Sequence, residues 1–290
     1  FTFFYFYEFL MTKRKELKQM NNFLISVKNK YKTGIMFEGG GSGHGGHKGN
    51  NWVTMPLKYS IMKELHTERE ISLLQPIAAV ELFAFVSIYQ KELINLLDMN
   101  SIFSLRHHHK NNELCYKNKN KLITKYFAVE SAQIDKDLIE KTGMFFDIKP
   151  YKSIASFTSS EEWLVLNSKY RYFIRTDYKA CFDSIYTHTF KWLIGKDVND
   201  TKDFKNTNIY TTIDRILQNI NARTSNGIVV GPEFSRMIAE ILLQAIDRTV
   251  YSKLLNSGKA VGENYNVYRF VDDIFIFAES EELANEIVQI

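Results

Sequence analysis

The chain has 290 residues, of which 45% are hydrophobic, and it carries a formal net charge of +4 at pH 7. This length and apolar content are enough to bury the core of one large or two modest domains of a soluble globular protein. The two cysteines, Cys115 and Cys181, argue against a disulfide framework. The apolar run at 77–86 is too short for a membrane span and is interrupted by Glu81. We therefore expect a reducing, cytoplasmic setting without a membrane partner.

The first 55 residues are predicted to form a poorly structured extension. Residues 39–50 are rich in glycine and can bury almost nothing, as expected of a flexible linker or of sequence upstream of the true start. His44 and His47 have no cysteine or carboxylate beside them, so loop histidines are a better interpretation than a metal site.

The next hundred residues carry helical periodicity and two basic runs. Apolar residues recur at helical spacing from 57 to 97, which predicts two helices. Residues 143–148 are typical of a strand that ends in a turn at Pro150. The basic runs at 106–110 and 117–121 would suit phosphate contacts, although a solvated loop explains each of them equally well.

The second half of the chain mixes helices and strands. Ser160, followed by two glutamates, predicts the start of a helix. A strand is expected from Tyr170 to Thr176, then a helix from about Asp183. Further helices are predicted at 209–220 and 232–255, with a polar surface loop at 195–203. The absence of a strict βαβ rhythm favours an α+β fold with an antiparallel sheet.

Paired aspartates occupy a predicted turn near the end of the chain. The strand-like segments 266–268 and 274–277 flank Asp272 and Asp273, which indicates a β-hairpin with an acidic tip. Adjacent charges beside buried strands cost stability unless they bind a cation. Aspartate also favours tight turns for geometric reasons, which is the ordinary alternative for this pair alone.

A second strand-like segment, at 172–177, ends on Asp177 and would lie beside the hairpin, with Asp177 against Asp272. Three carboxylates in one small volume repel each other, and hard divalent cations such as Mg²⁺ relieve that repulsion. Two such ions, roughly 3.5–4 Å apart, serve phosphoryl transfer by activating the attacking hydroxyl and steadying the leaving group. The sequence therefore predicts a two-magnesium site.

Three segments resemble, in order, the central motifs of reverse transcriptases. They are Asp177-x-x-x-Cys181-Phe182-Asp183-Ser184-Ile185, then Gly227-Ile228-Val229-Val230-Gly231-Pro232-Glu233-Phe234-Ser235-Arg236, then Phe270-Val271-Asp272-Asp273. Residues 184–192, and Gly231-Pro232 followed by 235–240, are most similar to prokaryotic defence-associated reverse transcriptases of the abortive-infection type. The chain departs from the family at Val229-Val230, where Pro-Gln is common, and at Phe270, where Tyr is common. These departures concern nucleotide selectivity rather than the metal site.

The resemblance covers about 145–280 well and 56–145 loosely. It implies a right-hand polymerase architecture, with mainly helical fingers at 56–165 and a palm at 166–290. Because the chain ends at Ile290, soon after Asp273, we expect a fragment without the thumb.

The resemblance also implies roles for individual residues. Asp177 and Asp272 would hold both Mg²⁺ ions, Asp273 would complete the catalytic and metal-binding set, and the backbone carbonyl of Tyr178 would be a further ligand.

Other residues are candidates for nucleotide binding. Phe182 stands where similar enzymes place an aromatic ring beneath the incoming sugar, which would favour deoxynucleotides; plain core packing is the alternative. Gly231 lets the backbone approach a base pair or phosphate before a helix start. Arg106 would contact the triphosphate, as basic residues of the fingers do in similar enzymes. For His188 and Trp192, four residues apart, buried packing is the default expectation.

Together with the two-metal site, the resemblance implies an RNA-directed or template-independent DNA polymerase that acts on dNTPs and an RNA template or DNA product, with a role in antiphage defence. One alternative is a template-copying reverse transcriptase of a retron or of a mobile element similar to group II introns. The other is a non-catalytic nucleic-acid-binding protein on a polymerase palm, which the presence of all three aspartates disfavours. The sequence leaves the template, the primer and the oligomeric state open, a homo-oligomer included.

Overall fold

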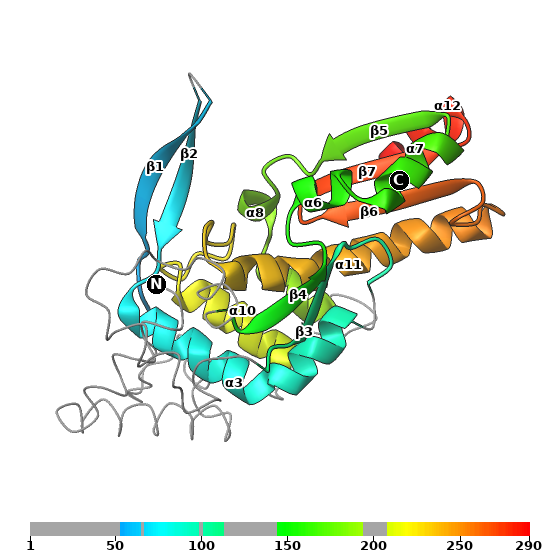
Figure 1. The fold of residues 1–290 in the computed structure, drawn as a ribbon. Coiled ribbons are helices and arrows are strands. Elements are labelled where there is room, and N and C mark those ends of the chain that lie inside the picture. The colour runs from blue at the N-terminus through cyan, green and yellow to red at the C-terminus, as the bar shows by residue number, and fades with distance from the viewer. Residues whose placement is uncertain (1–52, 65–66, 99–100, 113–143, 194–207) are drawn as a thin grey trace.

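The computed structural model describes residues 53–64, 67–98, 101–112, 144–193 and 208–290 (Figure 1). Its elements in chain order are β1 Leu57–Glu64, β2 Thr67–Leu73, α3 Pro76–Asp98, β3 Arg106–Lys110, β4 Phe146–Pro150, α6 Ile154–Thr158, α7 Glu161–Lys169, β5 Tyr172–Asp177, α8 Cys181–Ser184, α9 Thr189–Trp192, α10 Ile209–Asn219, α11 Glu233–Asn256, β6 Tyr265–Phe270, β7 Asp273–Ala278 and α12 Glu281–Gln289.

An antiparallel sheet in the order β5-β7-β6 organises the C-terminal part of the chain. Alternation along β7 gives the sheet two apolar faces. Phe275 and Phe277 pack with Phe157 and Leu166 of α6 and α7 on one face. Ile276 and Ala278 pack on the other face, in a cluster formed with residues of α11 and α12, including Leu254, Leu283 and Ile287. The sheet is therefore held between helices on both sides (Figure 1).

The largest apolar cluster lies among α3, α10 and α11, away from the sheet. It includes Phe85 and Leu93 of α3, Ile213 of α10 and Ile238 of α11, each fully buried. Phe182 and Val271 belong to the same cluster. The core thus extends to the segments beside the predicted aspartates, and its packing holds these segments in place.

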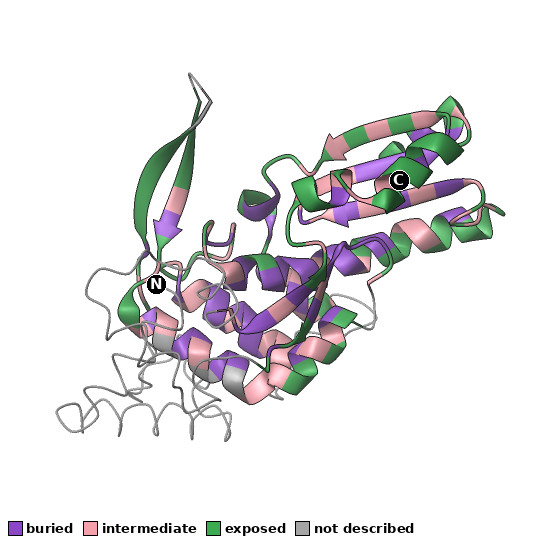
Figure 2. Cartoon of the chain, viewed as in Figure 1, coloured by how far each residue is buried: buried purple, intermediate pink, exposed green. Residues whose placement is uncertain are grey.

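The strands β1 and β2 form an antiparallel hairpin that projects from this helical body (Figure 1). Figure 2 shows that the hairpin is exposed over most of its length. Two helices were predicted within residues 57–97, but the first part of this range forms the β1–β2 hairpin and a single helix, α3, follows it. Residues 57–62 alternate between apolar and mostly polar side chains, which is the period of a strand. The apolar residues from Ile71 onward, however, have the same helical spacing as those of α3, so the sequence does not show where β2 ends and α3 begins.

Most other predicted elements are confirmed. The hairpin β6–β7, the neighbouring strand β5, and the helices α10 and α11 lie within a few residues of the expected bounds. Helix α7 begins at Glu161 and is capped by Ser160, whose hydroxyl accepts a hydrogen bond from the backbone N–H of Trp163. The helix expected from Asp183 is instead a single turn, α8, that ends at Ser184. The described residues between 56 and 165 include four strands, β1 to β4, as well as helices.

Some predictions fall on residues outside the described ranges. These are the glycine-rich segment with His44 and His47, the basic run 117–121, Cys115 and the loop 195–203. The basic run 106–110 lies in strand β3, which pairs with β4. Within the described ranges, no helix is long and apolar enough to cross a membrane.

Candidate active site

Asp272 lies in a two-residue turn at the tip of the β6–β7 hairpin. Phe270 pairs with Asp273 across the hairpin, so Val271 and Asp272 form the turn itself. Val271 has a φ of 58°, a conformation that costs a β-branched residue about 1–3 kcal/mol and persists only where the surrounding structure enforces it. Its side chain is buried in the core, and its carbonyl accepts a hydrogen bond of 3.0 Å from Arg269 Nη1. The packing of this side chain and the hydrogen bond from Arg269 therefore hold the turn in place.

Asp177 ends strand β5 beside this turn. The Cα partner of Asp177 is Asp273, one residue later than the sequence predicted. The backbone N–H of Tyr178, the next residue, donates a 3.1 Å hydrogen bond to the carbonyl of Asp272. This bond joins the two acidic segments directly. Asp177, Tyr178 and Asp272 all line one pocket of about 1000 Å³.

The carboxylate of Asp273 contacts Arg175 instead of the pocket. This carboxylate accepts hydrogen bonds from Arg175 Nη2 at 2.8 Å and Arg175 Nε at 3.2 Å, and it does not line the pocket. The guanidinium of Arg175 also lies over the ring of Phe275, 5.5 Å from its centroid. The structure therefore brings Asp177 and Asp272 to the pocket and leaves Asp273 in an ion pair beside it.

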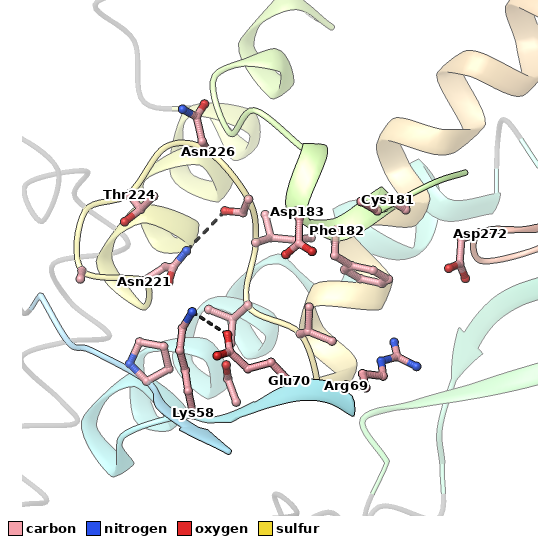
Figure 3. Close-up of a pocket in the computed structure, with 18 of the residues that line it drawn as sticks. Lys58, Arg69, Glu70, Cys181, Phe182, Asp183, Asn221, Thr224, Asn226 and Asp272 are labelled. Carbon is pink, nitrogen blue, oxygen red and sulfur yellow. Dashed lines mark hydrogen bonds and ion pairs between the residues drawn. The ribbon is translucent and has the colours of Figure 1, made fainter. Parts of the chain in front are cut away.

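Short backbone segments form the floor of the pocket (Figure 3). Phe182 of α8 is buried and lines the pocket, and its carbonyl accepts a hydrogen bond from the N–H of Ile228. Gly227 and Gly231 both have positive φ values, 78° and 122°. A Cβ on Gly231 would lie 2.7 Å from Cγ2 of Ile71 and 3.0 Å from the carbonyl oxygen of Ser72. Gly231 is therefore required for close contact with β2 and does not itself line the pocket.

The β1–β2 hairpin supplies charged side chains that the sequence did not reveal. Lys58, Arg69 and Glu70 line the pocket opposite Asp272 (Figure 3). Lys58 Nζ lies 2.7 Å from Glu70 Oε1, an exposed ion pair. The hairpin is joined to the pocket floor by a 2.8 Å hydrogen bond from the N–H of Ser72 to the carbonyl of Val230. These cations were missed because residues 57–73 were expected to be helical; the alternation of β1 was the available signal.

Arg106 lies away from the pocket. Its side chain is 4% exposed, forms an ion pair with Glu233 at the start of α11, and lies over the ring of Phe270. In the described structure these contacts join strand β3 to α11 and to the β6–β7 hairpin. The sequence could not reveal this pairing, because the partner is 127 residues away.

A buried charge cluster supports the acidic turn. Arg269 of β6 contacts Glu240 and Asp247 of α11 through hydrogen bonds of 2.7–3.0 Å, and all three residues are nearly inaccessible to solvent. Burial raises the pKa of both carboxyls and Arg269 lowers it. For Glu240 burial is the largest single effect, but the attraction to Arg269 and the hydrogen bonds from Arg269 and Ser104 together outweigh it and lower the pKa; for Asp247 burial prevails and the pKa is raised. His108 lies close by, and burial together with the charge of Arg106 lowers its pKa to about 4.

The donor set of the pocket fits magnesium. Among the described residues, no three His, Cys, Asp or Glu side chains gather closely enough to hold a metal ion alone. Mg²⁺ usually takes one or two carboxylates and completes its shell with water and substrate phosphates, which is what Asp177 and Asp272 offer. Burial raises the pKa of the Cys181 thiol to about 11, so this side chain stays protonated and is not a thiolate ligand.

The comparisons with known proteins agree with this geometry. No curated protein matches the chain. The profile of the family described as reverse transcriptase (RNA-dependent DNA polymerase) matches residues 104–290, which include Asp177, Asp272 and the pocket floor. This family consists of nucleotidyltransferases with a palm-type fold, consistent with the helices and small antiparallel sheets seen here. The chain belongs to the reverse transcriptase family and is an RNA-directed DNA polymerase by that membership.

Proposed function

We propose that the protein extends a hydroxyl primer with deoxynucleotides at the pocket between the β1–β2 hairpin and the acidic turn, in an antiphage defence system. The observation that carries this proposal is the shared placement of Asp177 and Asp272 on one pocket, with the N–H of Tyr178 bonded to the carbonyl of Asp272.

Asp177 and Asp272 are the proposed ligands of two Mg²⁺ ions. When bound, these ions would activate the attacking hydroxyl and stabilise the pyrophosphate that leaves. The carbonyl of Tyr178 accepts a 3.2 Å hydrogen bond from the N–H of Cys181 and keeps a second lone pair for a metal. Asp273 supports the site in this proposal by its position beside Asp272, while Arg175 neutralises its charge.

The remaining pocket residues bind and select the nucleotide. Arg69 lies on the hairpin side of the pocket, where a cation would attract the triphosphate, whereas Lys58 is already paired with Glu70. Phe182 forms part of the pocket floor and would exclude a 2′-hydroxyl by its bulk, which favours dNTPs over rNTPs. The backbone at Ile228, Val229 and Val230 supplies the surface against which a base pair can lie.

The defence role is supported by the similarity of residues 184–192 and 231–240 to abortive-infection reverse transcriptases. In that group some members synthesise DNA without a template and prime it on a protein hydroxyl. Whether this chain copies RNA or extends without a template is therefore the main question for experiment.

The test is incorporation of labelled dNTPs and rNTPs by the protein with Mg²⁺, with and without an added RNA template and primer. Asp272→Asn and Asp177→Asn keep the size of the side chain and remove the charge needed for the metal. Glu282→Ala, an exposed acidic residue of α12, is the matched control. A parallel reaction with a chelator in place of Mg²⁺ completes the set.

We expect incorporation of dNTPs that is lost in both aspartate variants and with the chelator, and that is retained in Glu282→Ala. Synthesis without template would support the defence-type activity, whereas dependence on template and primer would favour a template-copying enzyme. Activity that survives in Asp272→Asn would overturn the assigned site.

A further inference from the structure

Two aromatic side chains are exposed beside the active-site pocket. Tyr186 is 38% exposed and Trp192 is 41% exposed, although the residues between them include the fully buried Phe190. Their ring centroids are 6.1 Å apart, with an angle of 55° between the planes. The expected burial of Trp192 was therefore wrong. Large aromatic rings at the surface of a nucleic-acid enzyme are available for stacking on bases.

Polar contacts fix the surroundings of these rings. His188 packs edge-on against Tyr186 at 4.9 Å between centroids, and its Nδ1 lies 2.9 Å from Oδ2 of Asp214. Lys191 Nζ lies 2.6 Å from the same oxygen. The other oxygen of Asp214 accepts a 2.6 Å hydrogen bond from Gln218. Because the Asp214 side chain is completely buried, it anchors His188 and Lys191 to α10. We call Tyr186, His188, Lys191 and Trp192 the α9 patch.

The α9 patch adjoins the rim of the pocket. Tyr186 forms an antiparallel bridge with Asn226, and the N–H of Thr187 donates a 2.8 Å hydrogen bond to the carbonyl of Ser225. Asn226 and Thr224 line the pocket, on the side away from Asp272 (Figure 3). The backbone of the α9 patch thus adjoins two residues of the pocket rim, and a strand that leaves the pocket on this side would pass close to the patch.

We propose that the α9 patch binds unpaired nucleotides of the strand that adjoins the pocket, by stacking their bases on Tyr186 and Trp192. This inference rests on the proposed polymerase function and adds a contact with single-stranded nucleic acid outside the site of chemistry. Stacking rather than phosphate attraction is the main contact, because Asp214 already neutralises the charge of Lys191. The patch therefore tolerates any base, since every base offers an aromatic face.

The test is the Kd for a fluorescein-labelled single-stranded oligo(dT) of twenty nucleotides and its oligo(rU) counterpart, measured by anisotropy without dNTPs. The variants are Tyr186→Ala and Trp192→Ala, with Trp192→Phe as the form that keeps a ring. Leu164→Ala is the matched control, because Leu164 is a strongly exposed apolar residue on α7, outside the patch and the pocket. The dNTP incorporation of Asp272→Asn, measured separately, tests the proposed function.

Base stacking on an aromatic side chain contributes about 1–3 kcal/mol, which corresponds to a rise of about 5- to 150-fold in Kd for each alanine variant. Trp192→Phe should bind more tightly than Trp192→Ala, and Leu164→Ala should match the unmodified protein. The slope of log Kd against log salt should not change in Trp192→Ala, because no phosphate contact is lost. Glu282→Ala, which changes an exposed residue of α12 outside the pocket, should also bind the oligonucleotide as the unmodified protein does.

Unchanged Kd values in both alanine variants would refute base stacking on the α9 patch. The proposed polymerase function would still stand in that case if Asp272→Asn does not incorporate dNTPs. A loss of salt dependence in Trp192→Ala would instead assign the contact to phosphates and also overturn stacking. If the alanine variants do not fold, photo-crosslinking of a 5-bromodeoxyuridine oligonucleotide to the unmodified protein decides. Adducts on Tyr186 or Trp192 support the proposal, and adducts only elsewhere refute it.

Discussion

Removal of Arg269 is expected to destabilise the protein strongly, because two carboxylates in the core would lose their only described cationic partner. Its guanidinium makes five hydrogen bonds to Glu240 and Asp247 and a sixth to the carbonyl of Val271. Removing one partner from a buried charge cluster costs about 3–5 kcal/mol, out of a total stability of about 5–15 kcal/mol. In Arg269→Met we therefore expect Tm to fall by roughly 6–20 °C.

A triple variant separates charge from geometry. Arg269→Met combined with Glu240→Met and Asp247→Leu removes all three charges together and fills their space with apolar atoms. Such replacements are often neutral or stabilising by about 1–4 kcal/mol, so the stability should return. Incorporation of dNTPs should stay low, because the carbonyl of Val271 still lacks the donor that holds the Asp272 turn.

Thermal and urea unfolding, followed by circular dichroism, measure the first effect, and dNTP incorporation at a temperature where both variants are folded measures the second. An unchanged Tm in Arg269→Met would refute the energetic reasoning. Full activity in the triple variant would show that the turn does not need this hydrogen bond.

Three further predictions concern the pocket and the pH dependence of stability. Phe182→Ala should raise the incorporation of rNTPs relative to dNTPs by on the order of tenfold, because the ring would no longer exclude a 2′-hydroxyl. An unchanged ratio in competition assays would show that Phe182 only packs in the core. Arg69→Ala should raise KM for dNTPs by about tenfold with kcat little changed, since a cation near the triphosphate contributes to binding; steady-state kinetics would contradict this if only kcat fell. The neutral form of His108 is favoured in the folded protein, because its pKa falls from 6.5 to about 4. The contribution of neutral His108 to the free energy of unfolding should therefore be fully present above the pKa of the unfolded state and should decrease by about 2 kcal/mol between pH 7.5 and 5. In His108→Leu, the free energy of unfolding measured with urea should not show this decrease.

The C-terminal strands and helices were predictable because each carries its own local signal. β6 and β7 show strand-like composition on both sides of an acidic turn, and α10 places Ile213, Ile216 and Leu217 at helical spacing. The positions of Asp177 and Asp272 follow from the pairing of β5 with β7, which the order of the motifs already indicated.

Features that depend on distant partners were not predictable from the sequence. Arg106 was expected at a triphosphate, yet it pairs with Glu233, and Asp273 turns toward Arg175 rather than the pocket. The buried Arg269 cluster was missed as well. A lone arginine in an apolar strand was a usable signal, because a buried charge requires a partner, but the sequence alone does not say which carboxylates of α11 provide it.

The two apolar faces of β7 also limit how the length of this protein can vary. A single inserted residue would exchange Phe275 and Phe277 with Ile276 and Ala278 between the two clusters, and would change the partner of Asp177 in the same step. By contrast, the turn that follows α11 includes Gly258, which has a φ of 76° and where an added Cβ would meet no atom within 4 Å. A short insertion beside Gly258 leaves the register of β5 with β7 unchanged, so it should preserve more dNTP incorporation than a single inserted residue in β7.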